Sequence, residues 1–239
     1  MNFRALGGRL ASKLGGQKLS ARQYELPCDC KSSDALIVQN WRFISDDPKY
    51  EEKRIPDGDG LALYHLVKYA KPASTMEIGY YSGASTIAIC SGLRDLGQEP
   101  SMQHVALDLE DWHGGPQNVR AAGFGDFVRF VTGDSALTLP RLVNEGLTFD
   151  LIFIDGNHRF DFCLIDFFYS DRMLRNGGIV GFHDAGAEWP AVDKVVAFVE
   201  SHRAYASLGR LSGIQLYRKL RADFENGKFD REAHMFHKF

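Results

Sequence analysis

Residues 77–86, EIGYYSGAST, join an expected strand to an expected helix, and this stretch decides the fold. The residues over 75–78 predict a short strand, and the apolar spacing over 84–96 predicts a helix. Gly79 and Gly83 lie between them, and glycine allows a tight turn and a close approach of the backbone to a ligand. The stretch therefore predicts a strand–turn–helix unit whose helix N-terminus offers unpaired N–H groups to an anion.

Outward from this turn, expected strands and helices alternate along the chain. Further strands are expected over 104–108, 127–132, 149–155 and 178–183, further helices over 61–70, 135–145, 160–174 and 192–199, and a closing hairpin over 205–211 and 214–218. This alternation predicts an α/β fold with a doubly wound, seven-stranded sheet that is mostly parallel and has an antiparallel closing strand. Ligands bind such sheets outside the carboxyl ends of the strands.

The length of 239 residues suits one large domain with attached segments. We expect an N-terminal extension over 1–58 that serves oligomerisation or covers the substrate, a main domain over 59–220 and a C-terminal tail over 221–239. The hydrophobic share of 44% is ordinary for a globular protein with a real core. We expect the extension to pack over the domain or over a partner subunit, and its length favours a homo-oligomer.

Composition also bears on partners and location. The formal net charge of −3 argues against a protein that grips a nucleic-acid backbone. No stretch approaches the roughly 20 apolar residues of a membrane helix, so no membrane partner is expected. Cys90 and Cys163 stand in apolar contexts typical of small core residues, and a reducing, cytoplasmic setting is expected.

The glycine turn favours an amino-acid end as the ligand. Its spacing, Glu-x-Gly-x-x-x-Gly, differs from the Gly-x-Gly-x-x-Gly that cradles a pyrophosphate in nicotinamide-dependent oxidoreductases. The helix N-terminus suits a carboxylate, and Glu77 suits an ammonium group. The simpler interpretation is that these glycines only form the turn that follows a strand.

Two further acids follow expected strands. Asp108 ends the second strand, where an acid accepts both hydroxyls of a ribose, although a plain surface aspartate explains it equally well. Asp134 follows the third strand in Gly133-Asp134-Ser135, where it suits an adenine amine, a helix N-cap, or both.

Taken together, these elements resemble the class I S-adenosylmethionine-dependent methyltransferases. The resemblance covers about residues 60–218 and rests on EIGYYSGAST, HVALD, TGDS, FDLIFIDGNH and LRNGGIVGFHDA. It implies a Rossmann-like methyltransferase fold and S-adenosyl-L-methionine as cofactor. The implied cofactor-binding residues are Glu77, Gly79, Tyr80, Ser82, Gly83, Ser85, Asp108, Asp134, Ser135 and Asp155.

Two Asp and His pairs follow the fourth and fifth strands. Asp155 precedes His158 by three residues, and His183 directly precedes Asp184. Neighbouring strand ends lie about 5 Å apart, so the two carboxylates converge, which is costly unless a cation or a proton lies between them. Mg²⁺ or another divalent metal suits such oxygen ligands. The alternative is a helix-capping His158 and a satisfied strand-end His183.

This half resembles the metal-dependent O-methyltransferases, which include catechol, caffeoyl-CoA, macrolide-sugar and cephalosporin-tailoring enzymes. The resemblance implies metal binding by Asp155 and Asp184, with His183 as the candidate third ligand, and a general base at His158. The implied catalytic set is His158, Asp155 and His183. Position 185 is Asn in the catechol type and Ala here, which leaves the third ligand open. The implied substrate is a small hydroxylated molecule of natural-product type.

Three other functions remain open at this point. A non-catalytic protein that binds the cofactor on the same fold would show the same motifs. A nucleic-acid methyltransferase is disfavoured by the charge and by the lack of an Asn/Asp-Pro-Pro-aromatic motif. A nicotinamide-dependent oxidoreductase is disfavoured by the glycine spacing. Five aromatic residues are candidate walls of a substrate pocket, with plain core packing as the alternative: Tyr80, Tyr81, Trp112, His113 and Trp189.

Overall fold

The computed structural model describes residues 55–97, 103–186, 189–201 and 204–220, and the backbone of 224–225 and 228–229. The expected N-terminal extension and C-terminal tail lie almost wholly outside these residues, as does the side chain of Trp112. Along the described part, the helices are too short or too polar to cross a lipid bilayer.

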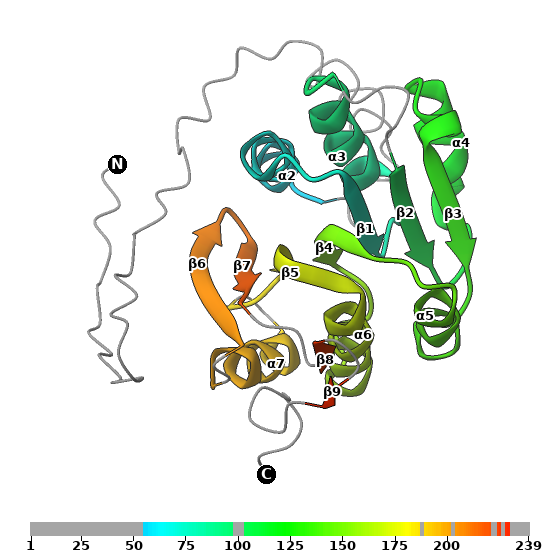
Figure 1. The fold of residues 1–239 in the computed structure, drawn as a ribbon. Helices are drawn as coiled ribbons and strands as arrows, with labels where there is room; N and C mark the ends of the chain where they lie inside the picture. The colour runs from blue at the N-terminus through cyan, green and yellow to red at the C-terminus, as the bar shows by residue number, and fades with distance from the viewer. Residues whose placement is uncertain are drawn as a thin grey trace, which may run out of the picture.

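Seven strands form one sheet in the order β3-β2-β1-β4-β5-β7-β6 (Figure 1). Strands β1 to β5 run parallel, β7 pairs antiparallel with β5, and β6 pairs antiparallel with β7. This arrangement confirms the predicted fold class. The strands are β1 (Ser74–Ile78), β2 (Gln103–Asp108), β3 (Val128–Thr132), β4 (Phe149–Ile154), β5 (Leu174–His183), β6 (Tyr205–Leu211) and β7 (Ile214–Lys219).

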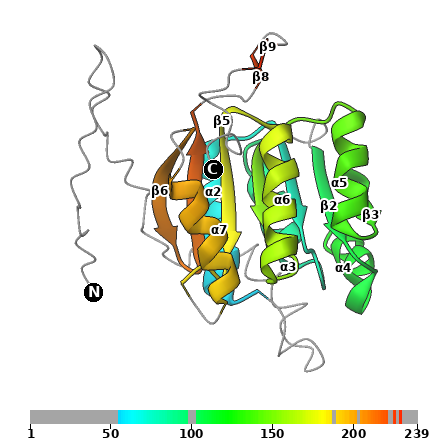
Figure 2. The ribbon, with the colours of Figure 1, turned by 90° about the horizontal axis from the view of Figure 1, so that it is seen from below.

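Helices cover both faces of the sheet, as Figure 2 shows. One apolar cluster joins the sheet to α2 (Asp57–Ala70), α3 (Ala84–Arg94) and α4 (Gly115–Ala121). A second cluster, on the opposite face, joins it to α5 (Ser135–Asn144), α6 (Phe160–Met173) and α7 (Pro190–Ser201). A core split evenly between two faces is what a doubly wound sheet requires.

Some elements differ from the expected ones. Helix α4 and the short 3₁₀ helices η2 (Trp112–Gly114) and η3 (Gly125–Phe127) were not predicted. Strand β5 begins four residues earlier than the predicted 178, directly after α6. A seven-residue helix that opens with Gly115-Pro116 has too few turns to display an apolar period, so its sequence pattern is weak. A small antiparallel pair, β8 (Phe224–Glu225) and β9 (Lys228–Phe229), stands apart from the main sheet.

Candidate active site

A cavity of about 890 Å³ lies at the carboxyl ends of the parallel strands. It is lined by the segments that follow β1, β2, β3, β4 and β5. The four aromatic candidates with described side chains, Tyr80, Tyr81, His113 and Trp189, line it too. Most of the predicted site residues line this one cavity: Gly79, Tyr80, Ser82, Ser85, Asp108, Asp134, Ser135, Asp155, His158, His183 and Asp184.

The turn after β1 passes extremely close to the segment after β4. Gly79 has a φ of +91°, and a Cβ at this position would lie 2.0 Å from the backbone oxygen of Asp155. Only glycine satisfies both the left-handed backbone and this approach. Tyr81 also has a positive φ, and its N–H donates to Asp108 Oδ2 at 2.8 Å. The turn is therefore fixed against both neighbouring strands, and it presents Ser82 and Ser85 to the cavity.

Two predicted cofactor residues, Glu77 and Gly83, do not belong to the lining of the cavity. The Glu77 side chain is fully buried, accepts a hydrogen bond from the Thr86 hydroxyl, and lies 3.0 Å from His104 Nε2. Side chains alternate along a strand, so Glu77 points to the α3 face while Ile78 points to the α5–α6 face. Glu77 thus braces β1 against β2 and α3.

Asp108 and Asp134 take their predicted places along the cavity. Asp108 Oδ1 accepts from the N–H of Leu109 at 2.7 Å, while its other oxygen accepts from the turn after β1. Burial raises the pKa of this carboxyl, and the backbone hydrogen bonds partly oppose the rise. Asp134 caps α5 by accepting from the N–H of Ala136 at 2.8 Å, and it still lines the cavity. The capping role and a ligand contact are therefore compatible.

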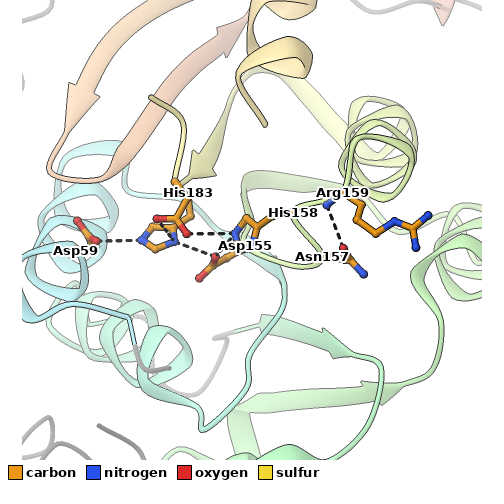
Figure 3. Close-up of polar contacts among 7 residues, drawn as sticks. Asp59, Asp155, Asn157, His158, Arg159 and His183 are labelled. Atoms are coloured by element: carbon orange, nitrogen blue, oxygen red, sulfur yellow. Dashed lines mark hydrogen bonds and ion pairs between the residues drawn. The ribbon is translucent and has the colours of Figure 1, made fainter. Parts of the chain in front are cut away.

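The strand ends β4 and β5 carry a group that we call the imidazole–carboxylate cluster: Asp59, Asp155, His158, His183 and Asp184. Figure 3 shows His183 between Asp59 and Asp155, with His158 on the far side of Asp155. His183 Nε2 lies 3.0 Å from Asp59 Oδ2, and His183 Nδ1 lies 2.9 Å from Asp155 Oδ1. A third carboxylate oxygen, Asp184 Oδ1, is 3.4 Å from the same Nδ1. Each ring nitrogen thus faces an acceptor.

The electrostatics follow from this arrangement. Burial alone would lower the pKa of His183, but hydrogen bonds to Asp155, Asp184 and Asp59 raise it to about 12. The His183 hydrogen bond in turn lowers the pKa of Asp184. Burial pushes the pKa of Asp59 upward, and its hydrogen bonds to His183, Ser212 and the Gly213 N–H bring it below its ordinary value. The cluster therefore holds an imidazolium that compensates its own acids.

Asp59 is the member of the cluster that the sequence did not reveal. It lies near the start of α2, 124 residues before His183, and it is only 4% exposed. An acid in the first turn of a helix ordinarily complements the helix dipole. No local pattern distinguishes such an acid from one that reaches across the fold.

His158 stands at the edge of the cluster. Its Nε2 is buried without a hydrogen bond, 3.4 Å from Asp155 Oδ1 and 3.3 Å from Asp184 Oδ2. The ring stacks on Trp189 with centroids 4.7 Å apart. The preceding turn is fixed by Asn157 Oδ1, which accepts from the Arg159 N–H at 3.0 Å (Figure 3). Nε2 therefore faces the two carboxylates, and the ring as a whole lines the cavity.

The predicted metal ligands converge but do not all offer a free donor. Ligand-type atoms of Asp155, His158, His183 and Asp184 lie within 4.8 Å of one another. A metal needs the lone pair of a neutral imidazole nitrogen, and both nitrogens of His183 face carboxylates. Two carboxylates remain as donors, with His158 as the third atom of the right type. Metal binding by Asp155, Asp184 and His183 therefore stays a prediction: their ligand atoms converge, and both nitrogens of His183 face carboxylates in this geometry.

Comparison with known proteins supplies a family context. A family model described as a methyltransferase domain matches residues 76–185. A caffeoyl-CoA O-methyltransferase of Petroselinum crispum is 28% identical over 131 residues, which cover 52% of this chain and 51% of that protein. A caffeoyl-CoA O-methyltransferase of Eucalyptus globulus is 29% identical over 126 residues, 52% of this chain and 49% of that protein. The chain thus spans about half the length of these curated relatives.

A solved structure extends the match over most of the chain. The O-methyltransferase from Bacillus cereus in complex with SAH superposes with a TM-score of 0.63 at 17% identity, over 81% of this chain and 94% of that chain. At this identity the likeness concerns the fold, and it confirms the predicted Rossmann-like methyltransferase architecture.

Proposed function

We propose that this chain, whose residues 76–185 match a methyltransferase domain, is a class I S-adenosylmethionine-dependent enzyme that transfers the cofactor's methyl group to a hydroxyl oxygen of a small molecule. One observation carries the proposal. A single cavity joins the glycine turn, the strand-end acids and the imidazole–carboxylate cluster. Cofactor and acceptor would therefore lie side by side, which is the main requirement of a direct transfer.

The cofactor is placed by its polar groups. Its amino-acid end would lie at Ser82, Ser85 and the N-terminus of α3, where unpaired N–H groups suit a carboxylate. Its ribose hydroxyls would donate to Asp108, and its adenine would lie at Asp134 and Ser135. The sulfonium methyl would then face the remaining part of the cavity, where the imidazole–carboxylate cluster lies.

We assign the general base to His158. The carboxylates of Asp155 and Asp184 lie 3.4 and 3.3 Å from Nε2, and we assign to Nδ1 the role of taking the proton of the acceptor hydroxyl. The oxygen attacks the methyl carbon in line, the carbon–sulfur bond breaks, and S-adenosylhomocysteine leaves. Asp59 acts through His183 as a positioning residue, because it holds the ring that in turn holds Asp155.

A divalent cation is the alternative for this end of the cavity. Asp155 and Asp184 would hold it, and it would lower the pKa of a bound hydroxyl. We expect turnover to survive dialysis against EDTA within about twofold, because an internal imidazole serves as base and His183 offers no free nitrogen. A fall of tenfold or more that Mg²⁺ restores would assign the two acids to a metal.

Calorimetric titration is the direct test of the cofactor. We expect micromolar binding of S-adenosylmethionine and S-adenosylhomocysteine and none of NAD. An acceptor screen would then monitor release of S-adenosylhomocysteine from small hydroxylated compounds, beginning with caffeoyl-type acceptors because of the relatives named above. Failure of both sulfur ligands to bind would refute the proposal. Binding without turnover on any acceptor would favour a cofactor-binding protein.

Three further expectations stay predictions. A small hydroxylated acceptor, rather than nucleic acid or a membrane, is proposed as the partner, and retention on heparin at moderate salt would contradict it. A homo-oligomer is proposed, and light scattering after gel filtration would test it. A cytoplasmic location is proposed from the cysteine usage, and Cys90 and Cys163 are buried free thiols in the structure.

A further inference from the structure

A buried acid at the cavity has no role in the reaction described so far. Asp166 lies on α6, is 1% exposed and belongs to the lining of the cavity. Its Oδ1 is buried without a hydrogen-bond partner, and no ion pair to Asp166 is found within the described residues. An unsatisfied buried carboxyl is costly, so such a group calls for a partner that the protein itself does not supply.

Its neighbours place this carboxyl at the adenine end of the cavity. The Ser135 side chain hydrogen-bonds to it and Asp134 acts on it through its charge, and both residues line the cavity. Gly156, which follows the β4 strand end, leaves room for it: a Cβ there would lie 3.1 Å from Asp166 Oδ2. Asp166 on α6 is therefore grouped with Asp134 and Ser135 at the start of α5, the two residues assigned to the adenine.

The pKa of Asp166 is consistent with a carboxyl that has an acceptor oxygen available to a ligand. Burial raises the pKa of Asp166 to about 7, the Ser135 hydrogen bond opposes this rise, and the charge of Asp134 adds to it. A hydrogen-bond donor from a ligand would satisfy the carboxyl without adding a charge. The exocyclic amine of adenine carries two N–H groups, which matches two acceptors, Asp134 and Asp166.

We propose that Asp166 accepts a hydrogen bond from the exocyclic amine of the cofactor's adenine and thereby selects a 6-amino purine over a 6-oxo purine. The proposal rests on the function proposed above. A 6-oxo group is an acceptor, so it would face acceptors with no hydrogen to share when both acids are ionised. A binding site that relies on a hydrogen bond discriminates strongly against an analogue that cannot form this bond. An apolar pocket discriminates far less between ligands of different shape.

The test compares two product analogues, S-adenosylhomocysteine and S-inosylhomocysteine, by calorimetry at pH 8. We expect the unmodified protein to prefer the adenosyl compound by about thirtyfold or more. In Asp166→Asn the amide accepts from a 6-amino group and donates to a 6-oxo group, so the preference should shrink at least tenfold. In Asp166→Ala the affinity for the adenosyl compound should fall about tenfold, with little change for the inosyl compound.

A matched control and the readout separate recognition from structure. Asp161→Asn removes the same charge from an exposed position on the same helix, and it should leave the preference unchanged. A purely structural role for Asp166 would weaken both ligands equally, and a preference unchanged within twofold in Asp166→Asn and Asp166→Ala would overturn the inference. Loss of both ligands in the unmodified protein would instead refute the proposed function, and this inference with it.

Discussion

Both ends of the cavity contain buried acids, but the surroundings of these acids differ. At the imidazole–carboxylate cluster, three carboxylates face His183, whose pKa rises to about 12. At the adenine end, no described residue forms an ion pair with Asp166, and burial raises its pKa to about 7. The protein compensates the acids of the first end, whereas one oxygen of Asp166, Oδ1, lacks a hydrogen-bond partner among the described residues.

This difference indicates which parts of the site are complete before a ligand arrives. Buried charges that are paired and hydrogen-bonded keep a fixed geometry, which suits residues that must align a base. A buried acid without a partner suits recognition, because the ligand that satisfies it gains more than one that does not. Each of the following changes tests one side of the comparison.

The largest effect is expected from removing the shared imidazole. His183→Ala would leave Asp59, Asp155 and Asp184 without their common partner, so the free energy of unfolding should fall by about 3–5 kcal/mol. Urea unfolding at pH 7 measures this loss. His65→Ala, a change on α2 away from the cluster, serves as the control. A loss below about 1 kcal/mol in His183→Ala would mean that the acids are not held by this ring.

Removing the base should affect rate and not binding. In His158→Ala we expect turnover to fall about a hundredfold or more, because a positioned general base contributes at least this much. Affinity for S-adenosylhomocysteine should stay within twofold, since the ring lies at the acceptor end. The exposed neighbour Arg159, changed to Ala, should alter neither quantity. Full activity in His158→Ala would place the base elsewhere.

The ribose contact should have an intermediate effect. Asp108→Ala is expected to weaken S-adenosylhomocysteine binding about tenfold or more, or about 1.4 kcal/mol, because charge-assisted hydrogen bonds to the ribose are lost. Calorimetry measures the affinity, and Glu110→Ala, exposed just beyond the strand, is the matched control. Unchanged affinity would remove Asp108 from the cofactor site.

The smallest effect concerns the pH dependence of stability. The pKa of Asp166 is about 7 in the folded protein and 3.8 ordinarily, so between these values the folded protein holds a proton that the unfolded chain releases. Stability from this group therefore decreases as pH rises through that window. From pH 6 to pH 7, the unmodified protein should lose about 1 kcal/mol more than Asp166→Asn does. Parallel profiles in urea unfolding would contradict the raised pKa.

Much of this arrangement follows from local sequence patterns. The glycine turn, the strand-end acids and the alternating elements are encoded within short windows, and most residues predicted from them line the cavity. Glu77 shows where such patterns fail: its chemistry suits an ammonium group, but the strand period turns its side chain toward α3. Asp59 and Asp166 lie on helices and reach the cavity only through tertiary packing, so no spacing along the chain predicts them.

The position of Asp59 has a consequence for the inheritance of this domain. The family model matches residues 76–185, which include His183 but not the acid that holds its Nε2. If that segment alone were exchanged between related genes, His183 would face an α2 helix from another protein. Positions 59 and 183 should then change together during evolution. The unit that recombination must preserve begins at α2, earlier than the stretch by which the family is recognised.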